Sequence, residues 1–106
     1  MSESLSQSER RAAERRPFDV YFNKYLEGQP YLCRSVDLSR TGMKVLRLSE
    51  PSSAVDAFPV ELQLPGDPES VWIWARAVRS EQADQALEFV GIDDAVRARI
   101  ERYLAA

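Results

Sequence analysis

The segment Phe58-Pro59-Val60-Glu61-Leu62-Gln63-Leu64 decides the fold of this chain. Apolar residues occupy every second position from Phe58 to Leu64, and a period of two is typical of a strand with one buried face. A loop-forming stretch precedes the segment, because residues 50–57 contain a proline, two serines and an aspartate. The turn sequence Pro65-Gly66-Asp67-Pro68 follows it. The chain is therefore expected to be built from short strands joined by tight turns.

Five further segments, on both sides of this one, have the composition of strands and end at turn residues such as Glu27-Gly28-Gln29-Pro30. These segments are Pro17–Leu26, Tyr31–Asp37, Gly42–Leu48, Ser70–Glu81 and Ala86–Ile92. The buried face of Ser70–Glu81 is ambiguous, because one face would carry two tryptophans and a valine while the other carries Val71, Ile73 and two alanines.

A terminal helix should follow Ile92, capped by Asp93 or Asp94. Its apolar residues recur at helical spacing, at Val96, Ile100, Tyr103 and Leu104. Six strands in series and one helix predict an all-β domain with one C-terminal helix. We expect a six-stranded antiparallel barrel with the helix packed on it.

The composition excludes several classes of protein. With 106 residues, 44% of them apolar, the chain is long enough for one domain with one core. It has no histidine and only one cysteine, Cys33, which argues against hydrolase triads, metal sites and intrachain disulfides. We expect Cys33 to be a small buried or half-buried hydrophobe. No apolar run is long enough for a membrane span, and the polar start does not resemble a signal peptide, so a cytoplasmic protein without a membrane span is expected.

Charge is distributed unevenly along the chain. Twelve of the 14 basic residues are arginines, and Arg10, Arg11, Arg15 and Arg16 lie together with Glu14 as the only nearby acid. The whole chain carries a net charge of −3, so the residues outside this cluster of +3 sum to −6. We expect residues 1–9 to be a disordered tail, residues 10–106 to form the domain, and residues 10–16 to be a basic arm. Because the body is acidic, the predicted partner is a small anion and not DNA.

Two motifs give the arm a function. Arg11-Ala12-Ala13-Glu14-Arg15 fits R-x-x-x-R, and after 21 intervening residues Asp37-Leu38-Ser39-Arg40-Thr41-Gly42 fits D-x-S-x-x-G. In this order and spacing they resemble the signature of PilZ domains, bacterial receptors for cyclic di-GMP. The segment Ala86–Asp93 is similar to the last strand of that family, although many relatives have a glycine at the position of Ala86.

The resemblance implies a binding protein for cyclic di-GMP, with no catalytic residue, no metal and no cofactor apart from this ligand. It implies that the ligand contacts Arg10, Arg11, Arg15, Arg16, Asp37, Ser39 and Gly42. The chemistry agrees, because guanidinium groups suit phosphates and the guanine O6 and N7 atoms, while a carboxylate and a hydroxyl can accept from guanine N1 and N2. An arginine at position 10, before R-x-x-x-R, is associated in the family with two bound ligand molecules per chain.

We expect a stand-alone receptor that acts in trans on an effector protein in motility, biofilm or exopolysaccharide control. One alternative is a PilZ-like adaptor that works without ligand, and another is a small barrel that binds single-stranded nucleic acid. Asp37 and Ser39 could also simply hold a hairpin turn, and Gly42 is structural under either interpretation. Trp72 and Trp74 fit the core or the barrel rim better than a stacking surface.

Overall fold

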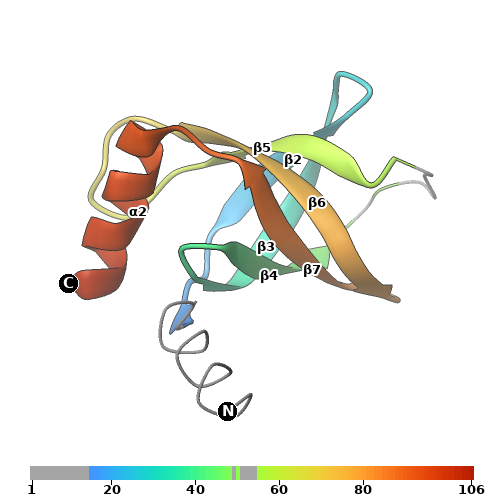
Figure 1. Ribbon diagram of the computed structural model, residues 1–106. Helices are drawn as coiled ribbons and strands as arrows, with labels where there is room; N and C mark the ends of the chain where they lie inside the picture. The colour runs from blue at the N-terminus through green and yellow to red at the C-terminus, as the bar shows by residue number, and fades with distance from the viewer. Residues whose placement is uncertain (1–14, 49, 51–54) are drawn as a thin grey trace, which may run out of the picture.

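The computed structural model of the chain describes residues 15–48, 50 and 55–106. They form seven strands and one helix (Figure 1). The strands are β1 (Arg16–Pro17), β2 (Tyr21–Leu26), β3 (Gln29–Leu38), β4 (Gly42–Arg47), β5 (Ala57–Leu62), β6 (Val71–Glu81) and β7 (Asp84–Gly91), and the helix is α2 (Asp94–Ala105). The predicted tail and most of the basic arm lie outside the described residues.

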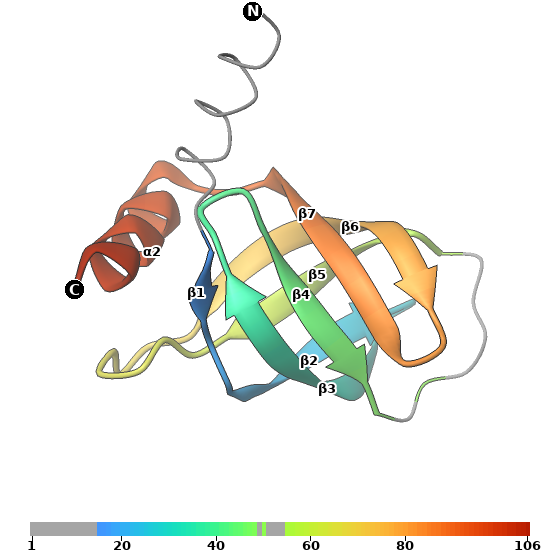
Figure 2. The same ribbon diagram turned by 90° about the horizontal axis from the view of Figure 1, so that it is seen from below.

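The strands form one antiparallel sheet that closes on itself. The order across the sheet is β1-β3-β2-β5-β6-β7-β4, and β4 pairs in turn with β3. Strands β2 to β7 thus make a closed six-stranded barrel, and β1 is a short addition beside the end of β3 (Figure 2). Closure pairs the edges that an open sheet would leave free. The predicted fold class is therefore confirmed.

The core lies inside the barrel and follows the alternation of the sequence. Phe58, Val60, Leu62 and Leu64 are all buried, although β5 itself ends at Leu62. On β6 the smaller face points inward, with Val71, Ile73 and Ala75 buried, while Trp72 and Trp74 remain half exposed. The narrow interior explains this choice, because side chains from six strands share one small space. The expectation that the tryptophans could lie in the core was therefore wrong.

The predicted first strand, Pro17–Leu26, is interrupted at residues 18–20. Ser35 on β3 is buried, and its hydroxyl donates to the carbonyl of Phe18 at 2.5 Å and accepts from the backbone N–H of Val20 at 2.9 Å. Together with backbone bonds from the N–H of Phe18 to the carbonyl of Val36 and from the N–H of Ser35 to the carbonyl of Val20, these bonds attach the interrupted segment to β3. The following turn is tighter than expected, since Glu27 and Gly28 alone form it, with φ of 52° and 81°, and Gln29 already belongs to β3.

Helix α2 lies at one end of the barrel, beside the loop between β5 and β6 (Figures 1 and 2). Ile100 is buried, as the helical spacing predicted, and the ring of Tyr103 meets that of Phe18 edge to face at 5.6 Å. Arg99 is bonded to Asp67 at 2.6 Å, which lowers the pKa of that carboxyl below its usual value. The helix is thus held by both apolar and ionic contacts.

The capping prediction was only partly correct. Asp93 is the N-cap residue, and its carbonyl accepts the first helical bond, from the N–H of Arg97 at 2.8 Å. Its side chain makes no capping hydrogen bond. Asp94 pairs loosely with Arg97 at 3.7 Å. The acidic pair therefore favours the helix through its charge near the N-terminus more than through a side-chain cap.

Among the described residues, Lys24 is a charged side chain that is buried in the barrel. Lys24 is 1% exposed, and its ammonium donates to Gln85 Oε1 at 2.7 Å and lies 3.0 Å from Glu50. It also lies 4.4 Å from the ring centre of Phe58. A buried ammonium needs such partners, because leaving it unpaired costs several kcal/mol, by order of magnitude. This cluster therefore has a structural explanation.

Candidate functional site

The site is built on the turn between β3 and β4, where D-x-S-x-x-G falls. Ser39 is fully buried, and its hydroxyl accepts from the backbone N–H groups of Thr41 at 3.2 Å and Gly42 at 3.1 Å. Its own N–H donates to the carbonyl of Gly42 at 2.9 Å. The side chain thus serves the turn, as serine hydroxyls commonly do. Any direct contact of Ser39 with a ligand stays a prediction.

Gly42 is required by the neighbouring strand. A Cβ atom at this position would lie 2.2 Å from the carbonyl oxygen of Leu87 on β7. No other residue fits there unless the two strands move apart. The glycine of the motif therefore brings β4 close to β7 and fixes the position of the turn on the barrel.

Asp37 is the polar group that the turn presents outward. Its side chain is 21% exposed, and Oδ1 accepts from Arg15 Nη1 at 2.7 Å and from the backbone N–H of Lys44 at 3.2 Å. The side chain of Arg15 is 49% exposed. The last arginine of R-x-x-x-R and the aspartate of D-x-S-x-x-G therefore lie in contact. Both groups remain open to solvent and can exchange partners.

Arg16 lies elsewhere. Its Nη1 donates to two carbonyl oxygens at the end of α2, those of Tyr103 at 2.5 Å and Ala106 at 2.8 Å. Its guanidinium also lies 4.7 Å from the ring centre of Tyr103. A cation suits the C-terminus of a helix, where the carbonyl groups lack partners. Neighbouring arginines of the arm thus have different partners, and Arg16 contacts the helix and not Asp37.

Arg10 and Arg11 lie outside the described residues, so their contacts stay predictions. Two other arginines near the turn were missed by sequence reasoning. Arg40, inside the motif, pairs with Glu101 of α2 at 3.6 Å. Arg40 and Arg97 of α2 both line a pocket beside the turn. The motif could not predict them, because Arg40 occupies one of its variable positions and Arg97 lies outside it, on α2.

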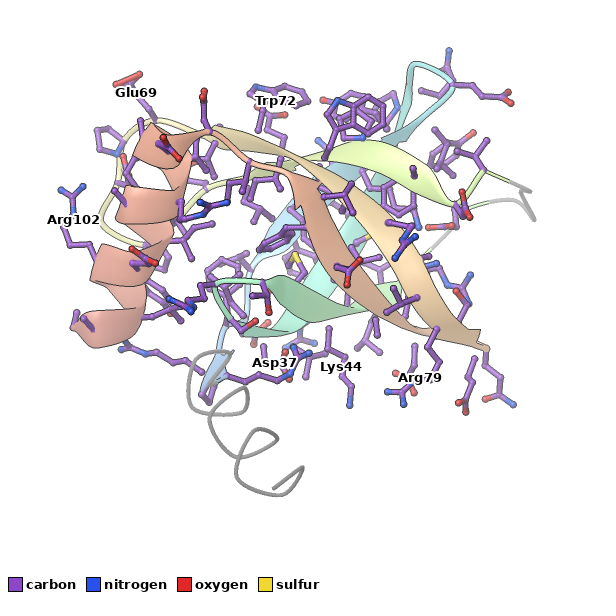
Figure 3. All side chains as sticks on the ribbon, viewed as in Figure 1. Asp37, Lys44, Glu69, Trp72, Arg79 and Arg102 are labelled. Carbon is purple, nitrogen blue, oxygen red and sulfur yellow. The ribbon has the colours of Figure 1, made fainter. Side chains whose placement is uncertain are left out.

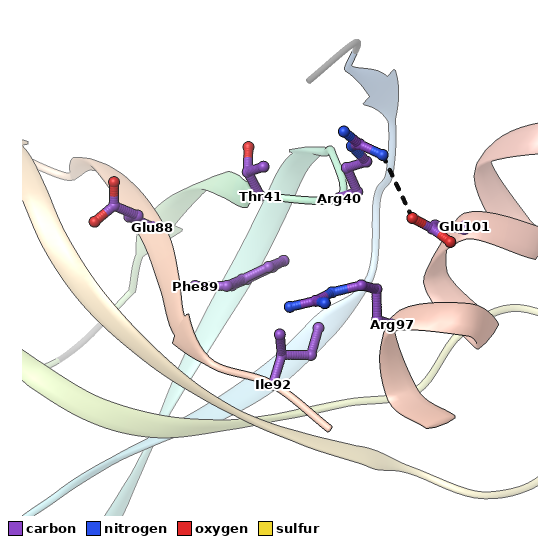
Figure 4. A pocket seen from close by; sticks show the side chains of 7 residues that line it. All are labelled: Arg40, Thr41, Glu88, Phe89, Ile92, Arg97 and Glu101. Carbon is purple, nitrogen blue, oxygen red and sulfur yellow. Dashed lines mark ion pairs between the residues drawn. The ribbon is translucent and has the colours of Figure 1, made fainter. Parts of the chain in front are cut away.

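That pocket, of about 390 Å³, lies between the turn, β7 and α2 (Figure 4). Its seven lining residues include two arginines and two glutamates: Arg40, Thr41, Glu88, Phe89, Ile92, Arg97 and Glu101. These charges cancel, so the pocket offers an anion little net attraction. The surface around Arg15 and Asp37 is a better place for a phosphate.

Two sequence candidates lie away from this turn. Trp72 packs against Tyr25 of β2, with ring centres 5.2 Å apart, and both tryptophans are 51% exposed on β6. Figure 3 shows Trp72 and Asp37 on opposite sides of the barrel. Cys33 is completely buried, as predicted, and burial raises the pKa of its thiol to about 11. Neither feature joins the arginine–aspartate site.

The described part of the chain holds no cluster of three or more metal-ligating side chains. Among the described helices, none has the length and apolar character needed to cross a membrane. A comparison with curated proteins finds no match. A family model for the PilZ domain matches residues 9–106, which include both motifs, the whole barrel and α2. This match covers nearly the entire chain, and the chain therefore belongs to the PilZ domain family.

Proposed function

We propose that this protein is a receptor for cyclic di-GMP that passes the signal to a partner protein. The PilZ domain implies a family that binds this nucleotide, and PilZ domains are binding modules and not enzymes. The observation that carries the proposal is the ion pair of 2.7 Å between Arg15 and Asp37, which joins the two halves of the motif. It brings a donor for phosphate and an acceptor for guanine to one exposed spot.

The proposed ligand contacts divide by chemistry. Arg10, Arg11 and Arg15 bind phosphates or the O6 and N7 edge of guanine, since guanidinium groups form paired hydrogen bonds with both. Asp37 accepts from guanine N1 and N2. The ligand competes with Asp37 for Arg15, and this competition is feasible because both side chains are partly exposed.

Ser39 and Gly42 support the site indirectly. The buried hydroxyl of Ser39 closes the turn, and Gly42 allows the close approach of β7. Both residues therefore keep Asp37 in position. We assign Arg16 to the end of α2, where its three contacts lie.

Two ligand molecules per chain are proposed, because Arg10 extends the motif to R-R-x-x-x-R. Two stacked cyclic dinucleotides bring four phosphate charges together, and an additional guanidinium neutralises part of that charge and stacks on an outer base. Titration at protein concentrations well above the dissociation constant counts the ligands. A ratio of one for the parent protein contradicts this stoichiometry.

The signal is proposed to act in trans, in the cytoplasm, on an effector of motility, biofilm or exopolysaccharide synthesis. Arg15 and Asp37 are partly exposed at the surface of the matched domain, where a partner protein can contact a bound ligand. The direct test of the receptor function is isothermal titration with cyclic di-GMP. Absence of heat at millimolar ligand, with a folded protein, refutes the receptor and leaves a ligand-independent adaptor.

Binding of single-stranded nucleic acid would give a different result from binding of cyclic di-GMP in titration experiments. A single-stranded nucleic-acid binder takes up oligonucleotides with a steep dependence on salt, and cyclic di-GMP does not displace them. That outcome contradicts the proposal as well. Competition by cyclic di-GMP supports it.

A further inference from the structure

A row of charged residues runs across the outer face of the barrel from the proposed site. In the strand register, Asp37 on β3 is opposite Lys44 on β4, Lys44 is opposite Ala86 on β7, and Ala86 is opposite Arg79 on β6. Directly opposed residues project to the same face of a sheet. Figure 3 shows Asp37, Lys44 and Arg79 on the same side of the molecule. The row therefore crosses four neighbouring strands.

The two cations of this row have no partner in the described part of the chain. Neither the ammonium of Lys44 nor the guanidinium of Arg79 is joined to a described residue by a hydrogen bond or ion pair. On the same face, Asp37 is engaged by Arg15 at 2.7 Å and Glu88 by Arg76 at 2.8 Å, whereas Glu81 and Asp84, at the end of the β6–β7 hairpin, form no ion pair with a described residue. Two positive charges thus stay available for an anion.

The residue between these cations is small. Ala86 is half-buried and carries a single methyl group, so the surface is low between Lys44 and Arg79. Neighbouring strands lie about 4.8 Å apart, so the two Cα positions are separated by roughly 10 Å along the curved surface of the barrel. Both side chains are long enough to contact a phosphate group placed above Ala86. Glu81 and Asp84 are opposite each other in the register at the end of the β6–β7 hairpin, and they limit the positive region on that side.

We propose that Lys44 and Arg79 form a second phosphate subsite above Ala86, so that the nucleotide extends from the turn across β4, β7 and β6. This inference rests on the proposed function and deepens it. Measured along the curved surface, Lys44 is about 5 Å and Arg79 roughly 14 Å from Asp37. One phosphate of a cyclic dinucleotide is bound by the arm, and further phosphate, on the same or a stacked second molecule, is bound over Ala86.

The test is isothermal titration of the full chain with cyclic di-GMP, using Lys44→Gln, Arg79→Gln and the control Arg102→Gln. Arg102 is also exposed, but it lies on α2 away from the row (Figure 3). Each row variant is expected to raise the dissociation constant about threefold to fivefold, the upper part of the range for an exposed charge contact, while the control changes it by less than about twofold. The difference should shrink in high salt, which screens exposed charges.

A variant at Ala86, between the two cations, separates the effect of surface shape on binding from the effect of charge. Ala86→Leu keeps the net charge and raises the surface between the two cations, so affinity should fall while the melting temperature stays near that of the parent. If the parent binds and Arg15→Ala weakens binding, but both row variants behave like Arg102→Gln, the subsite is refuted and the receptor stands. If the parent itself does not bind, the receptor function is refuted and the subsite with it.

Discussion

Replacing Arg15 by alanine should weaken cyclic di-GMP binding much more than it destabilises the fold. The pair with Asp37 is partly exposed, at 49% and 21% for the two side chains, and exposed pairs contribute about 0.2–1 kcal/mol to stability. A charge-assisted hydrogen bond to a bound anion contributes about 1.5–3 kcal/mol. Because the ligand must first displace the internal pair, the net loss of binding free energy is about 1–2.5 kcal/mol. That loss is about five- to seventyfold in the dissociation constant.

Arg34→Ala is the matched control for this prediction. Arg34 forms a pair of the same kind with Asp19, also at 2.7 Å and also exposed, but it lies outside the motif. Titration calorimetry and urea unfolding of the parent and both variants provide the measurements. The reasoning is refuted if Arg15→Ala binds as the parent does, or if its unfolding free energy falls by more than about 2 kcal/mol, since the pair would then be structural.

Three further predictions concern groups that stabilise the helix end, the turn and the core. Arg16→Ala should lower the unfolding free energy by about 1–2 kcal/mol and speed amide exchange at Tyr103, because the end of α2 loses its cation; unchanged exchange contradicts this role. Gly42→Ala should cost about 1–3 kcal/mol in thermal unfolding, as its Cβ would meet Leu87, and a variant as stable as the parent contradicts that contact. Cys33 should react with thiol reagents only when the protein unfolds. Because burial raises the pKa of its thiol to about 11, its contribution to stability should be lost as pH rises from about 9 toward 11. Rapid labelling of the native protein at pH 8 contradicts its burial.

The barrel could be predicted because the alternation of apolar residues is visible within the sequence of a single strand. The alternation from Phe58 to Leu64 survives intact in the structure, and so does the helical spacing around Ile100. What could not be predicted depends on partners distant in sequence. Ser35 breaks the expected first strand by bonding Phe18 and Val20, and a serine in a strand carries no sign of such a role.

The orientation of β6 shows a second limit. Each face of the strand carries apolar residues, so hydrophobicity alone cannot choose between them. The choice depends on volume, since the interior accepts Val71, Ile73 and Ala75 and leaves the tryptophans outside. Volume is a property of the closed barrel and of all its strands together.

The arginine arm is the clearest case of information that only the pairing of strands supplies. Within a strand, successive side chains point to opposite faces. Arg16 is opposite Leu38, which is in the core, so its side chain turns toward the inner side and the end of α2. Arg15, one position earlier, reaches the outer face and Asp37. The sequence shows two adjacent and equal arginines; the short pairing of β1 with β3 sends one of them to the proposed ligand site and the other to the helix.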